Sequence, residues 1–142
     1  MPIEPRRICT AAPDHHLEVD HGHIQLSTGP KEQHSRPAIN VTFRSAALAY
    51  GERVAGVILT GEMDDGVAGL WEIKRRGGIA IVQNPEEAQY PSMPLSALRE
   101  IAVDYTVRLA EMGPLLSRLA VGEGEGKRTS LEREAMEPIL TI

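Results

Sequence analysis

The stretch from Val54 to Leu70 constrains the fold of this chain more than any other feature. Residues 54–60 are too uniformly apolar to alternate between a buried and an exposed face, so they predict a strand that is covered on both sides. A short loop with two adjacent acids, Asp64 and Asp65, follows, and apolar residues at helical spacing resume at Val67. Because ligands and catalytic groups gather at the carboxyl ends of parallel strands, a functional site is expected at this loop.

The rest of the chain continues the alternation of strands and helices. Strands are predicted at 7–12, 17–19, 24–26, 54–60, 79–82 and 105–107, and helices at 40–50, from 67 to a stop at 77–78, at 93–102 and at 114–119. The strands at 17–19 and 24–26 are expected to pair across a turn at 20–22. Asn40 is the expected N-cap of its own helix, and Gly51 is the expected stop. The elements between 54 and 82 predict a right-handed βαβ unit.

The bulk properties exclude several classes of protein. A length of 142 residues predicts one domain that is large enough to bury a hydrophobic core. The net charge of -5 and the pI of about 5.5 argue against nucleic-acid binding. No apolar run approaches the roughly 20 residues of a membrane helix, and the N-terminus lacks the apolar core of a signal peptide. We therefore expect a cytoplasmic protein without membrane insertion.

The C-terminal end differs in composition from the rest. From Val121 onward, alternating glycines and charges are typical of a linker. Residues 131–142 are expected to be a frayed helix or disordered. The domain is therefore expected over residues 1–120, with a tail at 121–142.

Asp65 admits two interpretations from the residues alone. In a Ser-His-Asp triad, a carboxylate holds the imidazole in the tautomer that accepts the serine proton, and a carboxylate between a buried strand and a helix start suits that role. Backbone N–H groups from Glu62 onward would then help to bind an oxyanion. Alternatively, Asp64 or Asp65 caps the helix that follows.

The other parts of a triad are not evident. No serine lies in a Gly-x-Ser-x-Gly turn after an apolar strand. Cys9, the single cysteine, excludes an intrachain disulfide and is expected to be a small apolar residue rather than a nucleophile. The histidines are His15, His16, His21, His23 and His34. Imidazole and carboxylate groups near residue 14 suit zinc or iron, but spacing fixes no third ligand, so no metal site is predicted.

A nucleotide site is the other alternative. Gly61, Gly66 and Gly69 follow the apolar strand, but their spacing is not that of a dinucleotide-binding loop. No acid is placed to bind a ribose after the next strand, and the lysine of a phosphate-binding loop is absent. The basic residues 74–76 at a helix end are best explained as partners of the helix dipole. We therefore expect no cofactor.

The loop resembles a signature of the CheB family, the chemoreceptor protein-glutamate methylesterases, which reads Leu-Thr-Gly-x-x-x-Asp-Gly-x-x-Gly and here runs from Leu59 to Gly69. Further matches follow in the same order at residues 11–17, 29–30, 36–43, 77–78, 82–85 and 93–94. The resemblance covers about Arg7 to Ala120. It implies that Asp65 is the triad acid and that the fold is α/β, with a doubly wound, mostly parallel sheet flanked by helices.

The resemblance also implies an activity and a partner. Members of the family hydrolyse glutamate methyl esters on the cytoplasmic domains of methylated chemoreceptors, releasing methanol, and often deamidate glutamine. No cofactor or metal is implied. The family's serine and histidine segments have no counterpart before Arg7, which implies a domain that is incomplete at its N-terminus. A further domain or partner chain would supply that segment, and we expect this chain alone to be inactive.

Two residues depart from the family's pattern. Asn40 stands where aspartate is more usual, and Glu62 stands where the family has a methionine whose backbone serves the oxyanion. Two other functions stay open: a non-catalytic module that retains a receptor-binding surface, and a different enzyme that uses Cys9 or the histidines.

Overall fold

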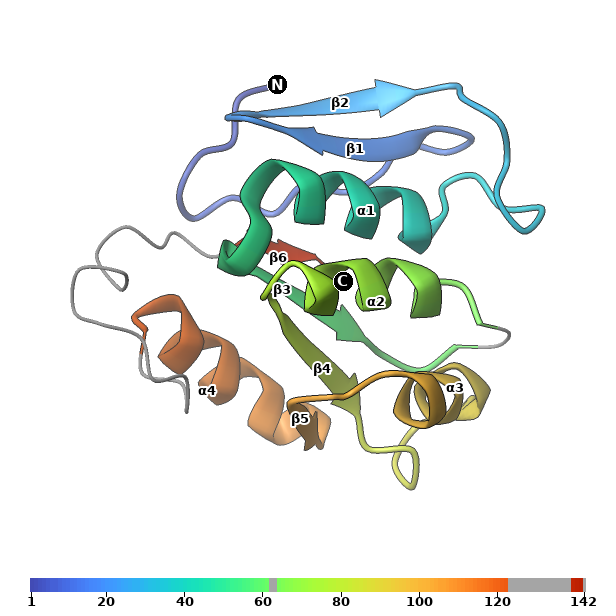
Figure 1. Cartoon of the computed structure of the whole chain (residues 1–142), viewed down its shortest axis with the longest axis vertical. Coiled ribbons are helices and arrows are strands. Elements are labelled where there is room, and N and C mark those ends of the chain that lie inside the picture. Colours follow the sequence, from blue (N-terminus) through green and yellow to red (C-terminus); the bar gives the residue numbers. More distant parts are fainter. Residues whose placement is uncertain (62–63, 123–138, 142) are drawn as a thin grey trace.

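The structure is a computed structural model that describes residues 1–61, 64–122 and 139–141 (Figure 1). Its strands are β1 (His16–Asp20), β2 (His23–Ser27), β3 (Val54–Ile58), β4 (Ile79–Gln83), β5 (Tyr105–Val107) and β6 (Ile139–Thr141). Its helices are α1 (Ile39–Tyr50), the short 3-10 helix η1 (Gly51–Arg53), α2 (Val67–Arg75), α3 (Ser92–Glu100) and α4 (Leu109–Ala120).

Four strands form one parallel sheet in the order β5-β4-β3-β6. Ile58, the last residue of β3, lies beside Val82 of β4, so the loops after these neighbouring strands leave the same edge of the sheet. α2 connects β3 to β4, as expected for a βαβ unit. The predicted α/β fold with a parallel sheet flanked by helices is confirmed.

Helices cover both faces of the sheet, which explains why β3 is buried along its whole length. On one face α1 and α2 lie side by side and contribute Phe43, Leu70 and Ile73 to the core (Figure 1). On the other face α4 contributes Met112 and Leu115. Each such large apolar side chain stabilises the fold by about 1.5–3 kcal/mol relative to exposure.

The close contact between α1 and α2 depends on Gly69. A Cβ atom built there would lie 2.6 Å from the Cβ of Phe43 and 3.0 Å from the Cα of Asn40. Such distances are too short for carbon atoms, so only glycine lets the two helix backbones approach this closely. This contact places the N-termini of α1 and α2 next to each other.

The predicted hairpin forms and lies on the outer side of α1 (Figure 1). Leu17 pairs with Leu26, and Leu17 and Val19 join the core cluster beneath the hairpin. The Val19 N–H donates to Ser45 Oγ over 2.9 Å, and Thr42 Oγ1 donates to the Leu17 carbonyl over 2.7 Å. These bonds attach β1 to α1.

Two predicted elements are wrong. Residues 7–12 do not form a strand: among the described residues no β-pairing joins them to another segment, and Ile8 is 95% exposed. At the other end, residues 139–141 form β6, which pairs with the first half of β3, although a frayed helix or disorder was expected there. Residues 123–138 and 142 lie outside the described part of the chain.

Other boundaries shift without changing the order of elements. β3 ends at Ile58 rather than residue 60, and α4 begins at Leu109, five residues before the expected start. The domain boundary at residue 120 stays a prediction. Among the helices that the structure describes, none is both long enough and apolar enough to span a membrane.

Candidate active site

The Asp65 carboxylate lies beyond the carboxyl end of β3 and binds the N-terminus of α1. Its Oδ2 accepts a hydrogen bond from the Ile39 N–H at 2.8 Å, and its Oδ1 accepts one from the Asn40 N–H at 3.2 Å. These N–H groups have no partner inside their own helix, and the positive end of the helix dipole complements the negative charge. Asp65 is therefore held in one orientation by backbone groups of another element.

Asn40 performs the matching task for α2. Its side chain is buried, and its Oδ1 accepts hydrogen bonds from the Gly66 N–H at 3.0 Å and the Gly69 N–H at 2.8 Å. The prediction that Asn40 caps its own helix is wrong: Ala38 occupies that position, and Asn40 is the second residue of α1. Because the two helix N-termini are adjacent, each side chain reaches the other helix.

The expectation that Asp64 or Asp65 caps the following helix is also wrong. Gly66 is the N-cap residue of α2 and makes no side-chain cap bond. Its φ of 97° lies in the left-handed region that glycine tolerates. Asp64 is exposed, and only its backbone carbonyl contributes here, accepting the Val67 N–H at 3.1 Å. The two adjacent acids thus have different environments.

An ion pair connects this arrangement to the loop before α1. The Arg44 guanidinium binds the Glu32 carboxylate with two nitrogens, and this pairing lowers the pKa of Glu32 and raises the pKa of Arg44. The nearby Asn40 amide makes a smaller contribution in the same direction to the lowered pKa of Glu32. A carboxylate at position 40 would instead place a second negative charge near Glu32.

The stem of the Asp65 loop is held by the next strand and by the turn before α3. Gln83, buried at the end of β4, accepts the Thr60 N–H with its Oε1 at 2.8 Å. Thr60 Oγ1 accepts the Tyr90 N–H at 2.7 Å, and the Gly61 N–H donates to the Tyr90 carbonyl at 2.9 Å. Gln83 and Tyr90 were not among the predicted site residues, although a buried amide at a strand end is a recognisable signal. Glu62, the predicted oxyanion residue, lies outside the described residues.

Comparison with known proteins shows the family of this chain. The family model described as CheB methylesterase matches residues 1–116. This chain belongs to the CheB methylesterase family. The crystal structure of the Thermotoga maritima CheB methylesterase catalytic domain is similar, with a TM-score of 0.71 and 31% sequence identity over 75% of this chain and 59% of that one.

Curated relatives carry related names. A putative protein-glutamate methylesterase/protein-glutamine glutaminase of Leptospira interrogans is 38% identical over 118 residues, which are 82% of this chain and 61% of the relative. The corresponding Borreliella burgdorferi protein is 35% identical over 114 residues, or 78% of this chain and 30% of that protein. This CheB-family chain therefore spans about three fifths or less of these relatives.

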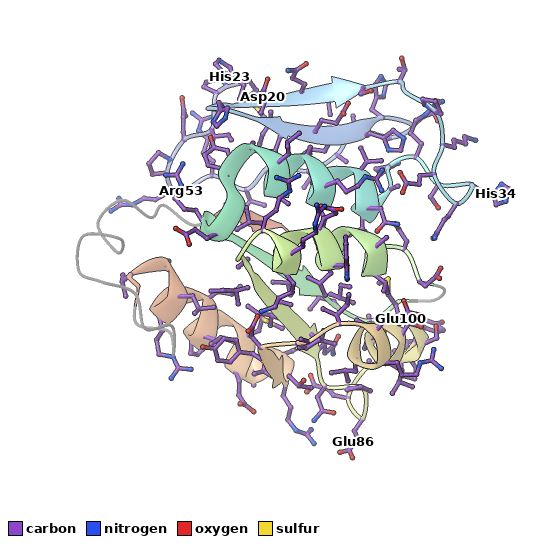
Figure 2. All side chains as sticks on the ribbon, viewed as in Figure 1. Asp20, His23, His34, Arg53, Glu86 and Glu100 are labelled. Atoms are coloured by element: carbon purple, nitrogen blue, oxygen red, sulfur yellow. The ribbon has the colours of Figure 1, made fainter. Side chains whose placement is uncertain are left out.

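In the part of this CheB-family chain that the structure describes, no histidine hydrogen-bonds to Asp65. His16 is buried, and its Nδ1 accepts the Ala38 N–H at 3.2 Å. Its Nε2 therefore carries the proton and donates to the Pro30 carbonyl at 2.8 Å, which makes His16 a support for the loop before α1. His23 and His34 lie on opposite sides of the molecule (Figure 2). Within the described ranges no three histidine, cysteine or acidic side chains are grouped to hold a metal ion.

The remaining candidates also have structural roles. Cys9 is half-buried against the main core cluster. The N–H groups of Gly66 and Gly69, which a phosphate would need, already donate to Asn40. Lys74 pairs with Asp104, and Arg75 and Arg76 pair with Glu72. In this CheB-family chain, Asp65 is thus the candidate that lies at the expected edge of the sheet.

Proposed function

We propose that this chain contributes the triad carboxylate, Asp65, to a protein-glutamate methylesterase that hydrolyses glutamate methyl esters on the cytoplasmic domains of chemoreceptors and also deamidates glutamine. The observation that supports this most directly is the fixed orientation of the Asp65 carboxylate at the end of β3, held by two N–H groups of α1. A preorganised carboxylate is what an imidazole needs in order to keep one tautomer.

The reaction would run in two steps. A serine hydroxyl adds to the ester carbonyl while the imidazole takes its proton, and the tetrahedral intermediate expels methanol, which receives that proton. Water then hydrolyses the acyl-enzyme, leaving the glutamate carboxylate. Asp65 stabilises the imidazolium in both steps. We place the serine and the histidine in the part of the longer relatives that this chain does not span, and we expect the chain alone to be inactive and cytoplasmic.

A second candidate is a non-catalytic module that binds receptors. It is favoured by one observation: no histidine in the described part of the chain hydrogen-bonds to Asp65, which binds α1 instead. Under this hypothesis Asp65 has only a structural role.

A chimera separates the two candidates. Residues 1–116 of this chain would replace the matching segment of the Thermotoga maritima catalytic domain, and release of methanol from a methylated receptor fragment would be measured. We expect activity in the chimera, a loss of about 10⁴-fold for Asp65→Asn, and a change of only a few-fold for Asp64→Asn. If the chimera is folded by circular dichroism and Asp65→Asn retains full activity, the triad role is wrong. Receptor binding by the unmodified chain would then support the second candidate.

A further inference from the structure

A pocket of about 320 Å³ lies on the exposed side of α2, between the end of α3 and the loop before α1. Trp71 forms one wall and is 50% exposed, an unusual environment for the largest apolar side chain. Val67 and Ile101 also line the pocket and are buried, so its inner surface is apolar. Nothing described above for Asp65 uses these groups.

The charges around the pocket are mostly negative. Asp64, Glu72 and Glu100 line it, and the one cation among the lining residues, Arg44, is already paired with Glu32. Glu72 is paired with Arg75 and Arg76 of its own helix. Within the described part of the chain, no hydrogen bond or ion pair engages the Asp64 or Glu100 side chain, and Figure 2 shows Glu100 at the α3 end that faces α2. The Asp64 and Glu100 carboxylates, which have no hydrogen-bond or ion-pair partner among the described residues, therefore lie in the same pocket as the half-exposed indole of Trp71.

The indole already interacts with a guanidinium. The Cζ of Arg75 lies 5.5 Å from the centre of the Trp71 ring, within the range of a cation–π contact. Arg75 is not among the residues that line the pocket, but its contact shows that a guanidinium can lie against this indole ring.

We propose that this pocket binds an arginine side chain of a polypeptide partner. The methylene stem would pack on Val67 and Ile101, and the planar guanidinium would stack on Trp71 and bond to Asp64 and Glu100. A residue within a polypeptide brings one positive charge and no carboxylate to the acidic pocket, whereas free arginine also brings an α-ammonium and an α-carboxylate, so the binding test compares the two ligands directly. This binding surface is separate from the hydrolytic step and does not depend on it.

Trp71 is the only tryptophan of the chain, so its fluorescence reports on the pocket directly. The purified chain would be titrated with the blocked tripeptide acetyl-Ala-Arg-Ala-amide and, as a neutral isostere, with the citrulline analogue. We expect a saturable change in Trp71 emission with a dissociation constant on the order of millimolar, and binding of the citrulline peptide about tenfold weaker or more. Equal responses to both peptides would overturn the proposal.

Variants test which carboxylates take part. Asp64→Asn and Glu100→Gln together should weaken binding of the arginine peptide by about tenfold, because both partners of the guanidinium lose their charge. Glu86→Gln, which removes a carboxylate from a distant exposed turn, is the matched control and should change nothing (Figure 2). Unchanged affinity in the double variant would contradict the proposal. Binding of free arginine as tight as that of the peptide would show that the site is not one for polypeptides.

Discussion

Asp65, in the loop just before α2, caps α1, and Asn40, in the first turn of α1, caps α2. The Asp65 carboxylate accepts the N–H groups of Ile39 and Asn40 at the start of α1, and the Asn40 side chain accepts those of Gly66 and Gly69 at the start of α2. These reciprocal caps join two α-helices that are separated along the chain by η1 and β3. The candidate catalytic acid is therefore also part of the fold's support, and its two roles can be measured separately.

Asp65→Ala should lower the free energy of unfolding by about 2 kcal/mol, because two N–H groups at the start of α1 lose their acceptor. Asp65→Asn, which keeps one acceptor oxygen, should cost about 1 kcal/mol. Urea denaturation followed by circular dichroism measures both. The control is Asp64→Ala, whose exposed side chain caps nothing, and its cost should stay within about 0.5 kcal/mol. A larger loss for Asp64→Ala than for Asp65→Ala would refute the assignment of the cap.

Asn40→Ala should be more damaging, at about 2–4 kcal/mol, because it leaves the buried N–H groups of Gly66 and Gly69 without an acceptor. Asn40→Asp keeps the acceptor but places a second negative charge near Glu32. We expect a cost of about 1–2 kcal/mol that becomes smaller in the Glu32→Gln background. A double-mutant cycle at neutral pH measures this coupling, and a coupling energy of zero would show that Glu32 and Asn40 do not interact.

Gly69→Ala should destabilise the protein although alanine is the better helix former. Propensity alone predicts a gain of about 1 kcal/mol, whereas the clash with Phe43 should cost about 1–3 kcal/mol. Ala68→Gly, on the exposed side of the same helix, tests propensity without packing and should cost about 1 kcal/mol. A higher melting temperature for Gly69→Ala would mean that α1 and α2 are not in close contact at this residue.

The Glu32–Arg44 ion pair predicts that part of the protein's stability against unfolding is lost in acid. The hydrogen bond from Arg44 lowers the pKa of Glu32 from its ordinary value of 4.5. A lowered pKa in the folded state means that the pair stabilises the protein at and above the ordinary pKa, and that this contribution is lost as the pH falls through the lowered pKa. Glu32→Gln should therefore cost about 0.5–1 kcal/mol at neutral pH and progressively less below the ordinary pKa.

Unfolding by urea at neutral pH and at a pH below the lowered pKa of Glu32 would measure this difference. Glu86→Gln is the control, since Glu86 is exposed and points away from the fold (Figure 2). If Glu32→Gln costs as much in acid as at neutral pH, the contribution of Glu32 comes from packing and not from its charge.

Local sequence patterns were sufficient for most of the fold. The apolar run at 54–60, the glycines after α2 and the turn between β1 and β2 each have a local physical cause, and each predicted the element that the structure has there, although β3 ends at Ile58. The position of Asp65 at the end of β3 follows from the same local reasoning. Residues 7–12 were mispredicted because a strand also needs backbone hydrogen bonds to a neighbouring strand, which a local sequence pattern does not predict.

The partners of the side chains could not be predicted in this way. Capping rules relate a residue to its own helix, so they assigned Asn40 to α1 and Asp64 or Asp65 to α2. The packing of α1 on α2 reversed this assignment, because Gly69 brings the two N-termini together. β6 was missed for a similar reason, since a three-residue strand forms only when β3 offers it an edge.

Residue spacing along the chain is enough to predict the order of elements from β1 to α4, the buried parallel sheet and the acid at its edge. Local spacing does not predict which helices Asp65 and Asn40 cap, that His16 supports a loop, or that Trp71 lines an acidic pocket. These features depend on contacts between segments that are distant in sequence, which packing alone brings together.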